Sequence, residues 1–259
     1  MLWITFRILT IMVLLFLTGG LRAHAQPADG EGVVLESVAE KTVSHDAIIN
    51  LGGDCQVAYQ LTKHGLRDYA LPFDALVTPY EALHALLTNE FEGFMTPDNF
   101  VFEMNEKAEK YILDKRYGIK LIHDFKINEK FLDDYEAVAS KYERRIARLF
   151  ERIRAAGYPL FIRKKITREQ AAELRALLHT MRNGRPFILA ALDGDKEGAS
   201  EQWNFESVRN FYLKQPEPYS WKGDSQAWKE IFMALGLPVT DGGKEKAAVA
   251  AVASVQSAA

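Results

Sequence analysis

The chain has 259 residues, a formal net charge of −3 and a single cysteine, Cys55. This charge excludes the strongly basic composition that is typical of nucleic-acid-binding domains, and no cluster of Lys and Arg alternates with aromatic residues. We therefore expect no nucleic acid as a partner. A single cysteine also excludes an internal disulfide, so the hydrophobic core must stabilise the fold without one.

The first 25 residues have the composition of a secretory signal. Arg7 precedes an apolar run over residues 8–17, and Ala23-His24-Ala25 matches an A-x-A cleavage site. An uncleaved membrane anchor is the alternative, but the uncharged stretch between Arg7 and Arg22 is short for a membrane span. We expect cleavage, a secreted or periplasmic protein, and no stable association with the membrane afterwards.

Composition divides the rest of the chain into three parts. Residues 26–45 are polar and acidic without a clear period, and they are predicted to form a leader. Residues 238–259 are rich in Ala, Val, Ser and Gly, which bury too little apolar surface to offset the entropy of ordering, so we predict a disordered tail. The part between them, residues 46–237, has the size of one domain.

Short apolar runs alternate with amphipathic stretches across this domain. Short apolar runs indicate buried strands, whereas apolar residues that recur every three or four positions indicate helices. The expected elements are, in chain order, a strand at 47–51, helices at 54–64 and 78–89, strands at 110–114 and 118–125, a helix at 129–156, a strand at 159–163, a helix at 167–182, a strand at 186–192 and a helix at 224–235. The pattern predicts an α/β fold with a central mixed sheet covered by helices on both faces, a three-layer α/β/α arrangement.

Capping residues support several of these helix starts. Asp54 is the expected N-cap of the first helix. Thr78 with Glu81, and Thr167 with Gln170, have the spacing of capping boxes, in which two side chains satisfy unpaired backbone N–H groups.

Cys55 lies in the segment "INLGGDCQVAYQL", where the first strand turns into the first helix. Unpaired N–H groups and the helix dipole at such a position stabilise a thiolate, and they can also stabilise an oxyanion. The alternative is a small apolar residue that packs at a helix start. The residues by themselves leave both interpretations open.

A nucleophilic cysteine needs a base, and His123 is the best placed histidine. It lies near the end of the apolar run "IKLIHDF", so a strand would carry it to the rim of a sheet. A histidine that only packs at a strand end is the alternative. Asp74, Asp124 and Asp193 are the acids that could orient its ring, although Asp124 would point to the opposite face of a strand. Spacing alone does not choose between Asp74 and Asp193.

These segments match a known pattern. The runs "INLGGDCQVAYQLTKHGLRDYALPFDALVTP", "YGIKLIHDF", "KYERRIARL", "PLFIRK" and "WKGDSQAWKEIF" together resemble a bacterial family described as papain-like cysteine peptidases of otherwise unknown function. The resemblance spans residues 46–237. The Trp of the family's "PFDW" element is replaced here by Ala75, so the packing around that loop is expected to differ.

The resemblance implies a Cys-then-His order, with Cys55 as the nucleophile and His123 as the base. It also favours Asp74 as the acid that holds the imidazole tautomer. In this mechanism the backbone N–H of Cys55, with the Asn50 side chain, would stabilise the oxyanion. Arg163 could bind a carboxylate of the substrate, or it could be a solvated charge at a strand end. The expected substrate is a peptide or another amide, including one linked to a glycan.

Two other functional classes match parts of the sequence. "LGGDC" also resembles the Gly-Asp-Ser block of certain esterases with Cys in place of Ser, but their Asp-x-x-His pair near the C-terminus is missing, since the last histidine is His179. A non-catalytic exported α/β domain that binds a glycan or peptide is the second alternative. Its groove could be lined by Trp203, Trp221 and Trp228, although aromatic residues at this density are mostly core.

Metal and nucleotide sites are not expected. No paired cysteines, His-x-x-x-His spacing or carboxylate-rich loop suits zinc or calcium. Gly52-Gly53 lacks the third glycine or the Lys-Ser/Thr pair of phosphate-binding loops. We therefore expect no metal and no other cofactor.

Overall fold

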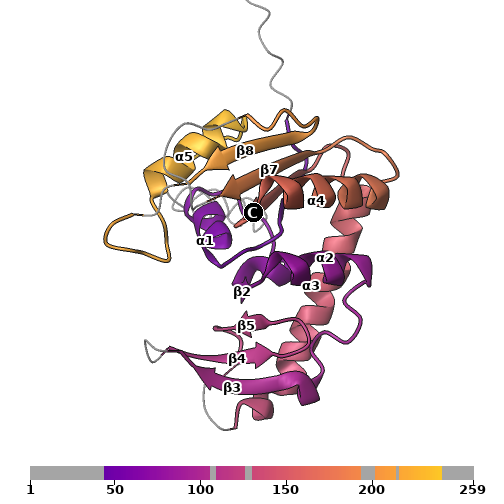
Figure 1. Cartoon of the computed structure of the whole chain (residues 1–259), viewed down its shortest axis with the longest axis vertical. Coiled ribbons are helices and arrows are strands. Elements are labelled where there is room, and N and C mark those ends of the chain that lie inside the picture. The colour runs from indigo at the N-terminus through magenta and orange to yellow at the C-terminus, as the bar shows by residue number, and fades with distance from the viewer. Residues whose placement is uncertain (1–43, 106–108, 126–129, 194–201, 214–215, 241–259) are drawn as a thin grey trace, which may run out of the picture. The chain divides into compact units, whose positions relative to one another are not determined.

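The computed structural model describes residues 44–105, 109–125, 130–193, 202–213 and 216–240, and it confirms the α/β class (Figure 1). The predicted signal peptide, nearly all of the leader and most of the tail lie outside these ranges. Within the described ranges, no helix combines the length and the apolar composition that a bilayer crossing needs.

One sheet is parallel throughout. It has the order β1-β6-β7-β8, in which Ile48 lies opposite Leu160 and Leu160 opposite Ile188. Its strands are β1 (Ile48–Asn50), β6 (Leu160–Lys164), β7 (Ile188–Asp193) and β8 (Val208–Tyr212). Because β1 and β6 run in the same direction, the segments that follow them leave from the same edge of the sheet.

Helices cover both faces of the parallel sheet. Five helices are described, namely α1 (Gln56–Lys63), α2 (Tyr80–Thr88), α3 (Tyr135–Ala155), α4 (Arg168–Met181) and α5 (Ser225–Ala234). Leu160 and Ile162 pack in one core with α1 and α5, whereas Phe161, which points to the other face, packs in a second core with α2, α3 and α4. The predicted α/β/α layering is therefore present around this sheet.

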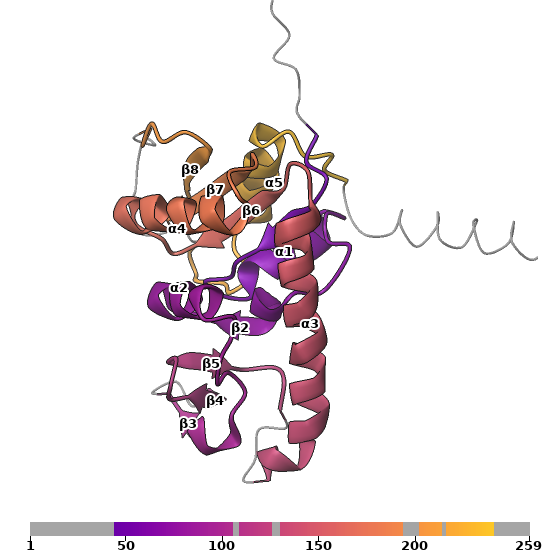
Figure 2. The same ribbon diagram turned by 90° about the vertical axis from the view of Figure 1, so that its right-hand side faces the viewer.

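The second sheet is antiparallel and has the order β2-β5-β4-β3. Its strands are β2 (Leu76–Val77), β3 (Phe100–Met104), β4 (Lys110–Asp114) and β5 (Ile119–Leu121). Parallel and antiparallel strands thus form two sheets, whereas the sequence pattern suggested one mixed sheet. The antiparallel sheet and α3 are both inserted between β1 and β6 of the parallel sheet (Figures 1 and 2).

One of the three capping predictions, the box of Thr167 and Gln170, is confirmed, and the predicted N-cap Asp54 lies one residue before the observed one. The Thr167 hydroxyl accepts from the N–H of Gln170, and the Gln170 side chain bonds back to Thr167. Asp54 accepts from the N–H of Gln56, although Cys55 is the N-cap residue. The capping box at Thr78 is wrong, because α2 begins at Tyr80 with Pro79 as its N-cap. Three short 3₁₀ helices also occur, at Pro72–Ala75, Pro97–Asn99 and Phe131–Asp134.

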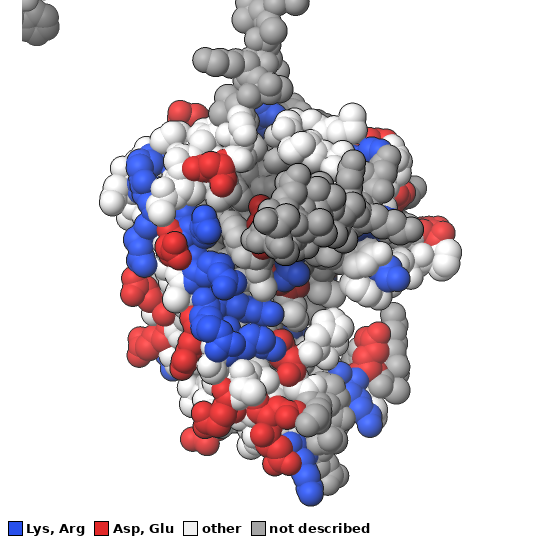
Figure 3. Space-filling view, turned by 180° about the vertical axis from the view of Figure 1, so that it is seen from behind, with Lys and Arg blue, Asp and Glu red and all other residues white. Residues whose placement is uncertain are grey.

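Helix α3 carries basic side chains along one side. They share this side because of their helical spacing, and they are Lys141, Arg145, Arg148 and Arg152. Figure 3 shows Lys and Arg side chains gathered in a band on the face where α3 lies. Arg148 donates to the carbonyl of Ala70 (2.8 Å), and the Arg152 guanidinium lies 4.9 Å from the centre of the Tyr69 ring. These contacts fix the segment that leads to Asp74 against α3.

Asp114 closes the turn between β4 and β5. Its Oδ1 accepts from the N–H groups of Arg116 and Tyr117, and its Oδ2 is buried with no hydrogen-bond partner among the described residues. Burial raises the pKa of the Asp114 carboxyl, although the two N–H groups act in the opposite direction. A carboxyl with a raised pKa stabilises the fold at low pH, and this contribution is lost as the pH rises through the folded-state pKa.

We expect that Asp114→Asn abolishes the loss of stability that ionisation of the Asp114 carboxyl causes as the pH rises. The free energy of unfolding of the variant, relative to that of the wild type, should increase as the pH rises from about 4 to about 7, because the amide stays neutral. Urea unfolding at several pH values measures this difference. Asp98→Asn, at an exposed position nearby, should show no such trend. An equal pH dependence of the two variants would contradict the prediction.

Candidate functional site

Cys55 lies at the carboxyl edge of the parallel sheet. It follows β1 after a short turn, it is the N-cap residue of α1, and its side chain is partly exposed. In open α/β sheets, ligands bind at this edge, where loops and helix N-termini converge. The predicted position of Cys55 between a strand and a helix is confirmed.

A close approach of two backbones positions the turn before Cys55. Gly53 has a φ of +111°, and a Cβ added to it would lie 2.4 Å from the carbonyl oxygen of Lys164. The Lys164 N–H donates to the carbonyl of Gly52 (3.1 Å), and the Thr78 N–H donates to that of Gly53 (3.2 Å). Only glycine fits at position 53, and the turn therefore lies directly against the end of β6.

Because the turn lies against the end of β6, Asp54 lies beside two lysines, Lys164 and Lys165. Its Oδ2 accepts from Lys164 Nζ at 2.8 Å and lies 3.1 Å from Lys165 Nζ. Burial acts to raise the pKa of Asp54, but the charges and hydrogen bonds of the two lysines outweigh it, so the pKa is lowered. Burial also lowers the pKa of Lys164, against the attraction of Asp54. We call these three residues the Asp54–lysine cluster.

The ionisation of Cys55 depends on the same groups. Burial raises the pKa of its thiol, and the Asp54 carboxylate raises it further. The backbone N–H of Cys55 and the charges of Lys164 and Lys165 act in the opposite direction. Because the net shift is upward, the resting sulfur is a thiol at neutral pH, and a base is needed to form the thiolate.

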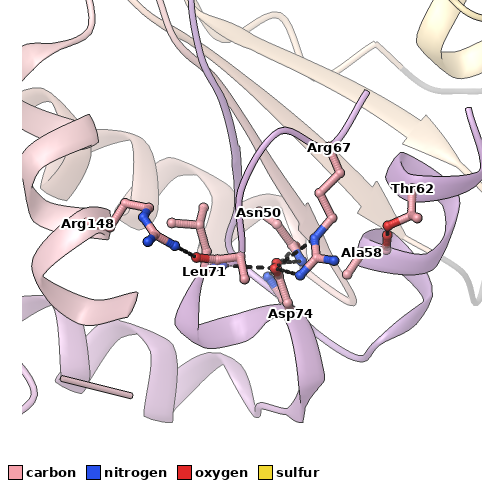
Figure 4. Close-up of polar contacts among 9 residues, drawn as sticks. Asn50, Ala58, Thr62, Arg67, Leu71, Asp74 and Arg148 are labelled. Carbon is pink, nitrogen blue, oxygen red and sulfur yellow. Dashed lines mark hydrogen bonds and ion pairs between the residues drawn. The ribbon is translucent and has the colours of Figure 1, made fainter. Parts of the chain in front are cut away.

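Asp74 lies in a buried network at the edge of β1 (Figure 4). Its Oδ2 accepts from Nε and Nη2 of Arg67 (3.1 and 2.6 Å) and from the N–H of Leu71 (2.9 Å). Its Oδ1 accepts from Nδ2 of Asn50 (3.0 Å), and Oδ1 of Asn50 accepts from the N–H of Gly52 (2.8 Å). Asn50 and Asp74, which were predicted to have separate catalytic roles, thus bind each other as parts of a structural network.

This network corrects the expected picture of the oxyanion site. Asn50 is 2% exposed, and both ends of its amide are engaged within the protein. Its side chain is therefore not available as an oxyanion donor in this geometry. Asn50, Arg67 and Asp74 also line a very small pocket, whose lining does not include Cys55.

Arg163 is a buried contact between backbone segments. It is 1% exposed, and its guanidinium donates to the carbonyls of Leu51 (3.0 Å) and Thr78 (2.8 Å). Burial lowers its pKa to about 10. The geometry therefore does not support the prediction that Arg163 binds a substrate carboxylate, and it also excludes a solvated strand-end charge.

His123 is exposed and lies two residues after the end of β5. β5 is antiparallel to β2 with Leu121 opposite Leu76, and Thr78, at the far end of β2, contacts the turn before Cys55. β5 therefore leads away from that turn. In the described part of the chain, no hydrogen bond joins His123 to Cys55 or to Asp74. The pairing of Cys55 with His123 stays a prediction.

The two other acids have different surroundings. Asp124 accepts from Lys141 (2.5 Å) and from the Tyr142 hydroxyl (2.7 Å), so it anchors the loop after β5 to α3. Asp193 is the last residue of β7. In the described ranges, Asp124 has no hydrogen bond to His123.

Lys164 and Lys165 are residues of the site that the sequence pattern does not identify. They were assigned only to the end of the strand "PLFIRK", because nothing local relates them to Asp54, 110 residues earlier in the chain. The feature of the sequence that could have identified them is the occurrence of two adjacent lysines at the end of a buried strand. The proposed aromatic groove is not formed, since Trp203 and Trp228 are buried and only Trp221 of the three is exposed.

Comparison with known proteins agrees with the resemblance in the sequence. A protein of Acanthamoeba polyphaga mimivirus, named "Uncharacterized protein R408", is 25% identical over 223 residues, which cover 74% of this chain and 99% of the relative. No solved structure matches the chain. Residues 46–187 match the family described as "Putative papain-like cysteine peptidase (DUF1796)". Because this match covers more than half of the chain, the protein belongs to that family.

Proposed function

We propose that this protein is a thiol-dependent hydrolase in which Cys55 attacks the carbonyl of an amide, with peptides as the expected substrate class. The observation that carries the proposal is the position of Cys55, a partly exposed thiol at the start of α1 and at the carboxyl edge of the parallel sheet. The description of the family to which the chain belongs points to the same chemistry.

The reaction would proceed in two steps. In the first, a base removes the thiol proton, the sulfur of Cys55 bonds to the carbonyl carbon, and the C–N bond breaks as the amine leaves with a proton. In the second, water attacks the thioester, which releases a carboxylic acid and restores the thiol. The backbone N–H of Cys55, at the start of α1, would donate to the oxyanion in both steps.

A base must take the proton of the Cys55 thiol. We keep His123 in this role because the family resemblance implies it, and its action would require the segment after β5 to approach Cys55. The Asp74 carboxylate does not orient His123 in this geometry, since it is engaged by Arg67, Asn50 and Leu71. Export from the cytoplasm is a further proposal, and it rests on residues 1–25 alone.

The test is formation of a thioester at Cys55. The purified protein is mixed with para-nitrophenyl acetate and with a peptide para-nitroanilide, and the acylated residue is identified by mass spectrometry. We expect acylation at Cys55, with turnover lower by at least about a thousandfold in Cys55→Ala and in Cys55→Ser. Unchanged circular dichroism would show that the variants fold.

Histidine variants distinguish the role of His123. His123→Ala should lower the acylation rate, whereas His179→Ala, a matched change at an exposed histidine on α4, should leave it unchanged. Turnover that survives in Cys55→Ala, or a wild type that forms no thioester with either substrate, would contradict the proposed function. The second result would favour a non-catalytic binding domain, which the raised pKa of the resting thiol also fits.

A further inference from the structure

We propose that the Asp54–lysine cluster binds an anionic group of the substrate, such as a carboxylate, beside the carbonyl that Cys55 attacks, and that Lys165 makes this contact. The inference rests on the proposed function of Cys55 and names its substrate class: acyl compounds that carry a negative charge close to the bond that is cleaved.

The charges of the cluster do not balance. One carboxylate, that of Asp54, faces the ammonium groups of Lys164 at 2.8 Å and of Lys165 at 3.1 Å. The cluster therefore has a net positive charge, although the whole chain is negative. An anionic ligand would complete the pairing.

The two lysines differ in their access to solvent. The Lys164 side chain is 2% exposed, so its ammonium is enclosed with Asp54, whereas the Lys165 side chain is 55% exposed. An ammonium has three N–H donors, and the contact with Asp54 uses one of those of Lys165. Because the Lys165 side chain is exposed and this contact leaves donors unused, Lys165 is the group that can bind a second anion.

The backbone of Lys165 also has a conformation that residues other than glycine rarely adopt. Its φ is +58°, in the left-handed region that favours glycine, and its N–H donates to the carbonyl of Leu192 at 2.8 Å. A lysine therefore occupies a position where glycine would be less strained. Such conformations persist where the surrounding structure holds them and are concentrated at functional sites.

Arg163, the next cation along β6, does not compete for this role. It is 1% exposed and is engaged by two backbone carbonyls. Helix α1 begins beside the cluster, and its dipole adds partial positive charge at the same edge. Both observations concentrate the accessible positive charge at Lys165.

The experiment compares an anionic and a neutral reagent for the same thiol. The rate of alkylation of Cys55 by iodoacetate is divided by its rate with iodoacetamide, in the full chain at fixed pH. We expect this ratio to exceed that of N-acetylcysteine amide, and to fall about three- to tenfold in Lys165→Met. Lys165→Glu should lower it further, and salt at about 1 M should reduce the differences.

Lys63→Met is the matched control, because Lys63 is exposed at the other end of α1 and its loss changes the net charge equally. Its ratio should equal that of the wild type. An unchanged ratio in Lys165→Met and Lys165→Glu would overturn the inference even if Cys55 hydrolyses its substrates. A changed ratio without thioester formation would keep the anion site and reject the proposed hydrolase, so the two failures are distinguishable.

Discussion

Replacement of Gly53 by alanine is expected to lower the free energy of unfolding by about 3–5 kcal/mol. A left-handed backbone at a non-glycine residue accounts for part of this effect, since Gly53 has a φ of +111°. The larger part comes from the added Cβ, which would lie 2.4 Å from the carbonyl oxygen and 2.9 Å from the carbonyl carbon of Lys164. Neither atom moves easily, because Lys164 is paired in β6 with its neighbour in the sheet.

The same change should also reduce the reactivity of Cys55. Separation of the turn from β6 moves Asp54 away from Lys164, which breaks the buried ion pair that adjoins the thiol. Gly118→Ala is the control, because Gly118 has a positive φ of +65° but nothing lies within 4 Å of an added Cβ. It should cost only about 1–2 kcal/mol. Equal losses of unfolding free energy in the two variants, measured by urea unfolding, would show that the close contact with Lys164 does not cause the destabilisation.

Replacement of Asp74 by alanine is expected to destabilise the protein by about 2–4 kcal/mol. The change leaves the Arg67 guanidinium, the Asn50 amide and the Leu71 N–H without the acceptor that they share. Asp74 is 6% exposed, so water does not readily replace the carboxylate. The network also fixes the end of β1, because Asn50 in turn binds the N–H of Gly52.

A double-mutant cycle separates this structural role from a catalytic one. Asp74→Ala and Arg67→Ala should be non-additive by at least about 1 kcal/mol in urea unfolding, because they remove the same ion pair. The exposed Asp98→Ala should leave stability within about 0.5 kcal/mol of the wild type. If Asp74 instead orients His123, Asp74→Asn would lower turnover as His123→Ala does while stability stays unchanged. That outcome would reject the structural assignment.

Local chemistry made several parts of the fold predictable. The strand at 110–114 is found at the same residues, and Thr167 with Gln170 forms the predicted cap. These signals act over a few residues, through side-chain periodicity or through a hydrogen bond to the nearby backbone. β2 was missed because it has only two residues, and β8 because its sequence VRNFY alternates weakly between polar and apolar side chains.

The strand predicted to contain His123 ends before it. The run "GIKLIHDF" predicted a strand over 118–125, but β5 ends at Leu121, where its pairing with β4 and β2 ends. Asp124 then binds Lys141 and Tyr142 of α3, which turns the chain away from the strand direction. The length of a strand depends on its partners, and these are distant in the sequence.

The sequence by itself determined the α/β class, the family and the position of Cys55 between the first strand and the first helix, because each follows from local residue patterns and from their order along the chain. Only the tertiary structure decided what surrounds that thiol. Asp54 meets Lys164 and Lys165 because parallel pairing brings the ends of β1 and β6 to one edge. Asp74 meets Arg67 and Asn50, and Arg163 binds two distant carbonyls, because burial requires every polar group to find a partner.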